Sequence, residues 1–126
     1  MIKSIIKHPP QAILFDWDNT LVNNWDPIFI AYNKTLESLG LKCMSREETL
    51  KNAKYSLRDT FPKIFKDDWE KAKKIFYKEF KKIHLKKIKP LPNVEKILKK
   101  IKKRKIICGV ISNKDGILLR KEINKL

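Results

Sequence analysis

Two aspartates, Asp16 and Asp18, stand where a short apolar segment runs into a polar turn. The apolar segment, residues 12–15, has the length and composition of a buried strand. Alternate side chains of a strand share a face, and both carboxylates can converge on one point where the strand ends. Such a pair could bind a hard cation such as Mg²⁺, which prefers oxygen ligands. It could also divide the work of phosphoryl transfer, with one carboxylate attacking phosphorus and the other moving a proton.

The residues around this pair make the pattern more specific. An isolated Asp-x-Asp can also be an ordinary surface turn, whereas here an apolar strand leads into Asp-x-Asp-x-Thr-Leu-Val. This stretch resembles the first motif of the haloacid dehalogenase (HAD) superfamily of phosphatases. The resemblance implies that Asp16 is the nucleophile that forms an aspartyl-phosphate, and that Asp18 is the general acid/base. It also implies that Thr20 shapes the turn and belongs with the substrate-binding residues.

A second apolar segment, within residues 105–114, leads to the hydroxyl side chain of Ser112. A serine after a strand says little alone, but at this distance from the first motif it is similar to the second motif of the superfamily. There a Ser or Thr donates a hydrogen bond to the phosphoryl group, which implies that Ser112, with Asn113 beside it, binds the phosphoryl oxygens. Residues 19–22 look most like the phosphoglycolate phosphatase-like branch, and this implies a small phosphorylated metabolite as substrate.

Helical patterns fill the rest of the chain. Asp26 is expected to cap a helix whose first residue is Pro27, and Ser45 begins a capping box. The further helices are predicted at Ser56–Phe65 with an interruption near Pro62, from Asp67 onward, after the cap residue Asn93, and after Asp115. The order is therefore a strand, a helical block, a helix, a strand and a helix.

This order resembles the HAD fold class: an α/β, Rossmann-like core of parallel strands with an α-helical cap inserted after the first motif. Residues 1–24 and 90–126 would be parts of the core, and residues 25–89 would be the cap. The cap is expected to pack mainly on itself, through Tyr32, Leu36, Trp69, Phe76 and Phe80. A closing lid excludes water and selects substrates.

Two basic residues of the predicted cap, Lys54 and Arg58, are candidates for binding a substrate carboxylate. The alternative is that they are ordinary solvated charges on helices.

Two motifs of the superfamily are not recognisable in this chain. The third is a lysine that neutralises the nucleophile and the phosphate, and the fourth is an acidic pair that completes the Mg²⁺ site. No acidic pair on an apolar strand follows Ser112, and Lys114 stands too early for the third-motif role. We therefore expect an N-terminal part of a HAD phosphatase, truncated at its C-terminus. Its Mg²⁺ ligands would be Asp16 and Asp18, the latter through its backbone carbonyl, and a catalytically dead remnant is the alternative to an active segment.

Composition adds a third hypothesis and a location. The 126 residues suit one domain, and 30 Lys+Arg against 14 Asp+Glu give a net charge of +16. The lysines are scattered between the apolar positions of helices, which favours solvated faces over a specific nucleic-acid site, although a basic nucleic-acid-binding helical module remains an alternative. Neither a long apolar run nor a signal-peptide pattern is present, so we expect a cytoplasmic protein without membrane contact. The oligomeric state is left open.

The two cysteines lack a metal-ligand spacing and indicate reduced thiols. Cys108, inside the second apolar segment, is expected to be part of the core.

Overall fold

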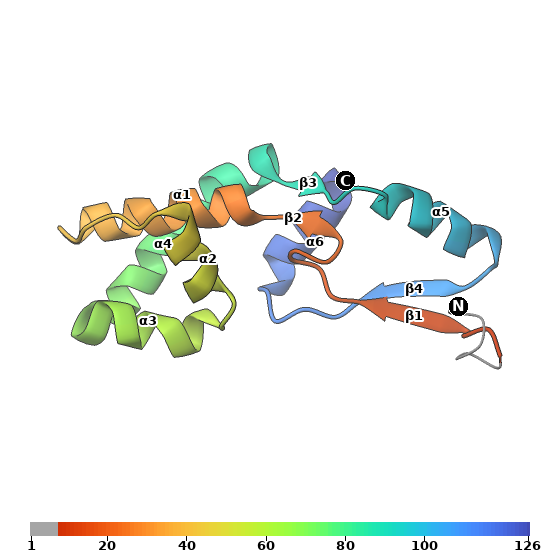
Figure 1. Ribbon diagram of the computed structural model, residues 1–126, viewed down its shortest axis with the longest axis horizontal. Coiled ribbons are helices and arrows are strands. Elements are labelled where there is room, and N and C mark those ends of the chain that lie inside the picture. Colours follow the sequence, from red (N-terminus) through yellow and green to blue (C-terminus); the bar gives the residue numbers. More distant parts are fainter. Residues whose placement is uncertain (1–7) are drawn as a thin grey trace. The chain divides into compact units, whose positions relative to one another are not determined.

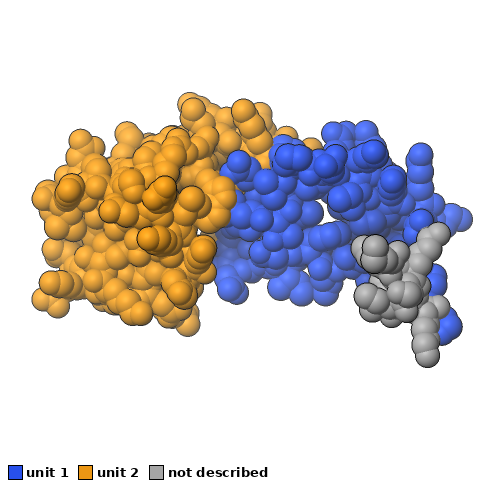
Figure 2. All heavy atoms as spheres, in the orientation of Figure 1, with its two compact units in different colours: residues 1–23, 90–114 blue, residues 24–89, 115–126 orange. Residues whose placement is uncertain are grey.

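The computed structural model describes residues 8–126 and divides into two compact units. Unit 1 comprises the described residues up to Asn23 together with residues 90–114, and unit 2 comprises residues 24–89 and 115–126. Figure 1 shows the labelled elements, and Figure 2 shows the two units in different colours. Residues 1–7 of the predicted core segment 1–24 lie outside the described residues.

Unit 1 is built on two parallel strands, β1 (Ala12–Phe15) and β4 (Ile107–Val110). Their register runs from Ala12 opposite Ile107 to Phe15 opposite Val110. The helix α5 (Val94–Lys103) precedes β4, and the two-residue strands β2 (Val22–Asn23) and β3 (Lys89–Pro90) lie where the chain passes between the units. The α/β fold class with parallel strands is therefore confirmed.

One face of the β1–β4 pair carries apolar side chains that stay exposed. Leu14 and Ile107 are 63% and 71% exposed. Leu14 lies over Gly109, where an added Cβ would come within 2.7 Å of the leucine Cδ2, so a larger residue at this position would require the Leu14 side chain to shift. The prediction that Cys108 belongs to the core is wrong, because its side chain is exposed. An apolar run marks a buried strand only where further elements cover both sheet faces, and in the described residues this sheet has two strands.

Unit 2 contains the helices α1 (Trp25–Ser38), α2 (Arg46–Ala53), α3 (Leu57–Phe65), α4 (Trp69–Lys87) and α6 (Gly116–Lys125), with a 3₁₀ turn at Lys66–Asp68. The capping box at Ser45 is confirmed, since its side chain and that of Glu48 each accept from the other's backbone N–H. Asp26, by contrast, is not a cap. The helix begins at Trp25, two residues before the expected Pro27, and Asp26 lies in its first turn, where a carboxylate also suits the helix dipole.

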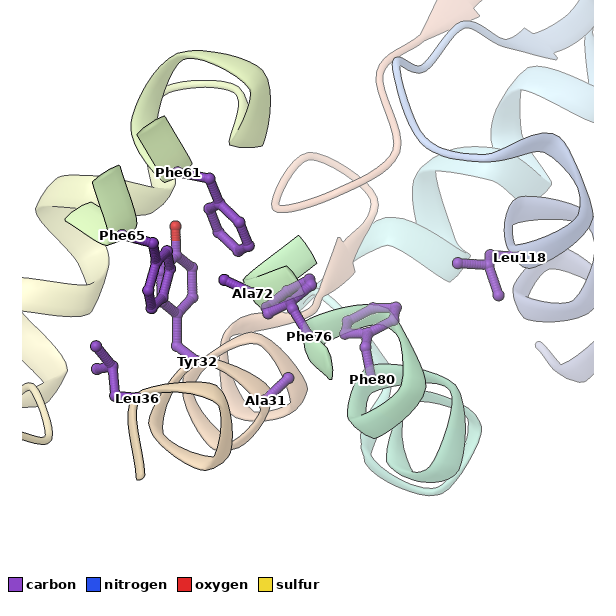
Figure 3. Close-up of a cluster of buried hydrophobic side chains, with 9 residues drawn as sticks. All are labelled: Ala31, Tyr32, Leu36, Phe61, Phe65, Ala72, Phe76, Phe80 and Leu118. Carbon is purple, nitrogen blue, oxygen red and sulfur yellow. The ribbon is translucent and has the colours of Figure 1, made fainter. Parts of the chain in front are cut away.

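The core of unit 2 is aromatic (Figure 3). Tyr32 makes edge-to-face contacts with Phe61 and Phe76, at centroid distances of 5.4 Å in both cases, and Phe76 stacks on Phe80. Burial raises the pKa of the Tyr32 phenol, while its hydrogen bond with Thr60 acts in the opposite direction. Pro62 lies inside α3 without interrupting it. The predicted packing of the helical block on itself is therefore confirmed for Tyr32, Leu36, Phe76 and Phe80, which are buried, while Trp69 is partly buried against the same cluster.

The last helix, α6, packs on α4 inside unit 2. Leu118 belongs to the same apolar cluster, and the buried side chains of His84 and Glu122 meet with 2.8 Å between Nδ1 and Oε1. Residues 115–126 thus group with the helices, whereas the sequence placed them with the core. The division into core and cap stays a prediction. Among residues 8–126, none of the helices combines the length and apolar composition that crossing a membrane requires.

We predict that Phe76→Ala destabilises the protein by about 3–5 kcal/mol, because it leaves a cavity among four aromatic neighbours. Urea unfolding followed by circular dichroism measures the change. The control is Lys73→Ala on the exposed side of the same helix, which should change stability by about 0.5 kcal/mol or less. Equal losses for the two variants would contradict the assigned core.

Candidate active site

The chain turns sharply after β1. The carbonyl oxygen of Trp17 accepts the backbone N–H groups of residues 20–22, over 3.0 to 3.3 Å, and the N–H of Asn19 donates to the carbonyl of Val22 over 2.7 Å. Asn19 has a φ of 59°, in the left-handed region that asparagine tolerates better than most residues. This turn places both aspartates of the first motif beyond the carboxyl end of β1.

Asp16 is exposed at the start of this turn. The hydroxyl of Thr20 donates to its Oδ2 over 3.2 Å, so the structure places Thr20 as a contact of Asp16, in agreement with its predicted part in the turn. The hydroxyl contributes no charge to the site, and the side chain of Asp16 remains accessible.

The end of β4 lies beside the end of β1. The N–H of Ile111 donates to the carbonyl of Phe15 over 2.8 Å, so the ladder continues one residue beyond the strand. Ser112 follows, and its Oγ accepts the backbone N–H of Lys114 over 3.1 Å. Because carboxyl ends of parallel strands meet at one sheet edge, this is the position where open α/β sheets bind ligands.

A lysine joins the two strand ends. The ammonium of Lys114 lies 2.7 Å from Oδ1 of Asp18, with side chains 9% and 30% exposed, respectively. The structure therefore brings Asp18 and Ser112 together through Lys114, while Asn113 lies exposed between Ser112 and Lys114 in the chain. Lys114 was given no role from the sequence, because it stands too early for the third motif. The sequence feature that could have indicated its contact is its place two residues after Ser112, since the parallel pairing brings the turn after β4 to the turn that holds Asp18.

The metal ligands proposed from the sequence are only partly assembled. Within the described part of the chain, no three or more His, Cys, Asp or Glu side chains group as a metal site would need. Magnesium in phosphoryl-transfer enzymes is commonly held by one or two carboxylates, with waters and substrate phosphate supplying the other oxygens. The side chain of Asp16 is exposed, and its carboxylate and the backbone carbonyl of Asp18 are oxygen donors, which is compatible with such a partial shell.

Lys54 and Arg58 are exposed on unit 2. Neither lies in the unit that holds the strand-end residues.

Comparison with known proteins identifies the family of this chain. Residues 13–126 match the family described as haloacid dehalogenase-like hydrolase. The chain belongs to the haloacid dehalogenase-like hydrolase family. The matched segment includes both strand ends and the helices of unit 2.

This HAD-like chain matches little more than half the length of each relative described here. A phosphoglycolate phosphatase from Aquifex aeolicus is 30% identical over 117 residues, which cover 92% of this chain and 55% of that protein. A haloacid dehalogenase-like hydrolase from Streptococcus pneumoniae superposes with a TM-score of 0.86 at 21% identity, over 93% of this chain and 56% of that one. A hydrolase from Pseudomonas syringae gives 0.72 at 13% identity, over 91% and 53%. At these two identities the structures establish the fold alone.

We predict that Asn19→Ala is less stable than Asn19→Gly by about 1 kcal/mol, because a Cβ is disfavoured at a φ of 59°. Both substitutions remove the asparagine side chain, so their difference isolates the backbone conformation. Urea unfolding of the two variants gives the comparison. An alanine variant as stable as the glycine variant would mean that the turn is not held in the left-handed region.

Proposed function

We propose that this chain is the nucleophile-bearing segment of a HAD-type phosphatase that, when complete, hydrolyses a small phosphomonoester of the phosphoglycolate kind. The observation that carries the proposal is the strand-end group, in which Asp16 is exposed and Asp18 meets the Ser112 turn through Lys114. Family membership and the identity to a phosphoglycolate phosphatase support it.

The proposed reaction has two steps. Asp16 attacks phosphorus with a carboxylate oxygen, the bond from phosphorus to the ester oxygen breaks, and Asp18 gives a proton to the departing alcohol. Asp18 then takes a proton from a water molecule that attacks the aspartyl-phosphate. Inorganic phosphate leaves and the carboxylate of Asp16 is restored. The Oγ of Ser112 already accepts an N–H, so its own hydrogen is available for a phosphoryl oxygen.

Mg²⁺ is the proposed cofactor. The carboxylate of Asp16 and the backbone carbonyl of Asp18 would hold it, with the remaining positions left to water and phosphate. When bound, the ion would offset the negative charge that gathers between the carboxylate and the phosphoryl group.

The helical block is proposed as a cap. Residues 25–89 would exclude water from the reacting groups and select the substrate, with Lys54 and Arg58 as candidates for a substrate carboxylate. The proposed location is the cytoplasm.

We predict that this 126-residue chain alone has negligible phosphatase activity. The third-motif lysine and later carboxylates are not recognisable in it, and losing one charge-stabilising group commonly costs on the order of a hundred-fold in rate. The assay is Mg²⁺-dependent hydrolysis of p-nitrophenyl phosphate. The comparison is the chain joined to the segment of the Aquifex aeolicus relative that follows the matched part, which should be active.

Asp16→Asn is the control in both forms, because it removes the nucleophilic oxygen and changes the side chain little. A metal-dependent rate in the 126-residue chain that Asp16→Asn abolishes would contradict the prediction of inactivity. An inactive joined protein that is nevertheless folded would favour the dead-remnant alternative.

The basic charge generates a further prediction. Any binding to DNA or RNA should be weak, independent of sequence and steeply dependent on salt, because scattered lysines contact phosphates and read no bases. Fluorescence anisotropy with two unrelated duplexes at several salt concentrations measures this. Tight, sequence-selective binding that persists at high salt would support the nucleic-acid-binding module instead.

A further inference from the structure

Lys114 contacts both Asp18, the proposed acid/base, and Ser112, the proposed phosphate ligand. The Lys114 ammonium pairs with Oδ1 of Asp18 at 2.7 Å, and its backbone N–H reaches Oγ of Ser112 at 3.1 Å. Its side chain is 9% exposed, although lysine is among the residues that folding buries least. Burying a lysine removes much of its hydration, which the contact with a carboxylate offsets.

The site has an electrostatic difficulty that this contact addresses. Asp16 and Asp18 are two residues apart at one strand end, and a phosphate ester is itself an anion. Two uncompensated carboxylates would repel each other and the approaching ligand. Thr20, the hydroxyl partner of Asp16, brings no positive charge. Lys114 supplies a positive charge, and that charge lies beside Asp18.

We propose that Lys114 is a positioning and charge-compensating residue of this site. Its ammonium cancels the charge that Asp18 carries in its unprotonated form and fixes the direction of that carboxyl group, so that the strand ends admit a phosphate group beside Asp16. The inference rests on the proposed function, since it takes Asp18 as the acid/base and Ser112 as a phosphate ligand. The role differs from that of the third-motif lysine, which neutralises the nucleophile and the phosphate.

A purely structural ion pair is the alternative, in which Lys114 only ties two turns together. The two hypotheses differ in what happens when both charges are removed. If compensation matters, Lys114→Met leaves one excess negative charge, and adding Asp18→Asn removes that excess. Asp18→Asn keeps the backbone carbonyl proposed for Mg²⁺. If Lys114 only holds the two turns together, the double variant should bind phosphate no more tightly than Lys114→Met.

The experiment is a titration of the 126-residue chain with inorganic phosphate in the presence of Mg²⁺, followed by two-dimensional NMR of the amide groups. The variants are Lys114→Met, Asp18→Asn, the double variant, and Lys102→Met as a matched loss of one exposed positive charge in the same unit. We expect Lys114→Met to weaken binding by about tenfold or more. The double variant should return to within about threefold of the original protein, and Lys102→Met should stay within about twofold.

If Lys114→Met does not fold, as its NMR spectrum would reveal, the order of the other proteins carries the test. Asp18→Asn, which keeps the ammonium and removes the opposing carboxylate, should bind phosphate at least as tightly as the original chain and more tightly than the double variant. An original chain that binds no phosphate, a double variant as weak as Lys114→Met, or equal binding by Asp18→Asn and the double variant would each overturn the inference.

These outcomes are separable from those of the proposed function. The expected order of phosphate affinities, with no hydrolysis by the joined protein, would leave the inference standing and remove the phosphatase proposal. Hydrolysis that depends on Asp16, with unchanged phosphate affinity in Lys114→Met, would do the reverse.

Discussion

The parallel pairing of β1 with β4 is the constraint on which the candidate site depends. Parallel neighbours cannot be joined by a tight turn, so a long crossover must run between them; here residues 16–106 separate the two strands in the chain. The same pairing places both carboxyl ends at one edge. Asp18 and Lys114, 96 positions apart in sequence, can therefore meet at 2.7 Å. Any slip of register would move the second turn away from the first.

The two units differ in how their stability is built. Unit 2 buries a continuous set of aromatic rings and a buried His–Glu contact. In unit 1, by contrast, α5 buries none of its residues, and the β1–β4 face carries exposed Leu14 and Ile107. The residues with proposed catalytic and binding roles at the strand ends thus lie in unit 1, whose helix and strands are less buried. A parallel sheet ordinarily has both faces covered, and the chain spans 55% of the phosphoglycolate phosphatase that it matches.

Local sequence signals predicted the elements whose determinants are local. Ser45 and Asp115 cap helices as expected, since a capping side chain bonds to N–H groups only two or three residues away. Asp26 was misassigned because the helix begins at Trp25, and its N-cap residue Asn24 makes no side-chain capping bond that a local sequence signal could mark. Cys108 was misplaced because burial of a strand depends on what packs against it, and that is not a property of the strand itself.

Lys114 was missed for a different reason. Its proposed role follows from a contact with Asp18, which stands after the neighbouring strand. A motif defined by spacing along the chain carries no information about that contact. The parallel order of the strands was nevertheless predicted, and it alone places the turns after Phe15 and Val110 side by side. Long-range contacts at strand ends are therefore predictable as neighbourhoods, while the side chain that makes the contact is decided by rotamers and burial.

The local surroundings also give the two aspartates different starting conditions for chemistry. Asp16 is exposed and has a neutral hydroxyl beside it, so its oxygens can approach an external electrophile without breaking an ion pair. Asp18 is less accessible and is oriented by an ammonium, which suits a group that must stay in one place while protons move to and from it. Two chemically identical side chains, two residues apart, thus differ in their partners, because the local turn brings Thr20 to Asp16 and the strand pairing brings Lys114 to Asp18. The assignment of nucleophile and acid/base proposed for this HAD-like chain is compatible with that difference.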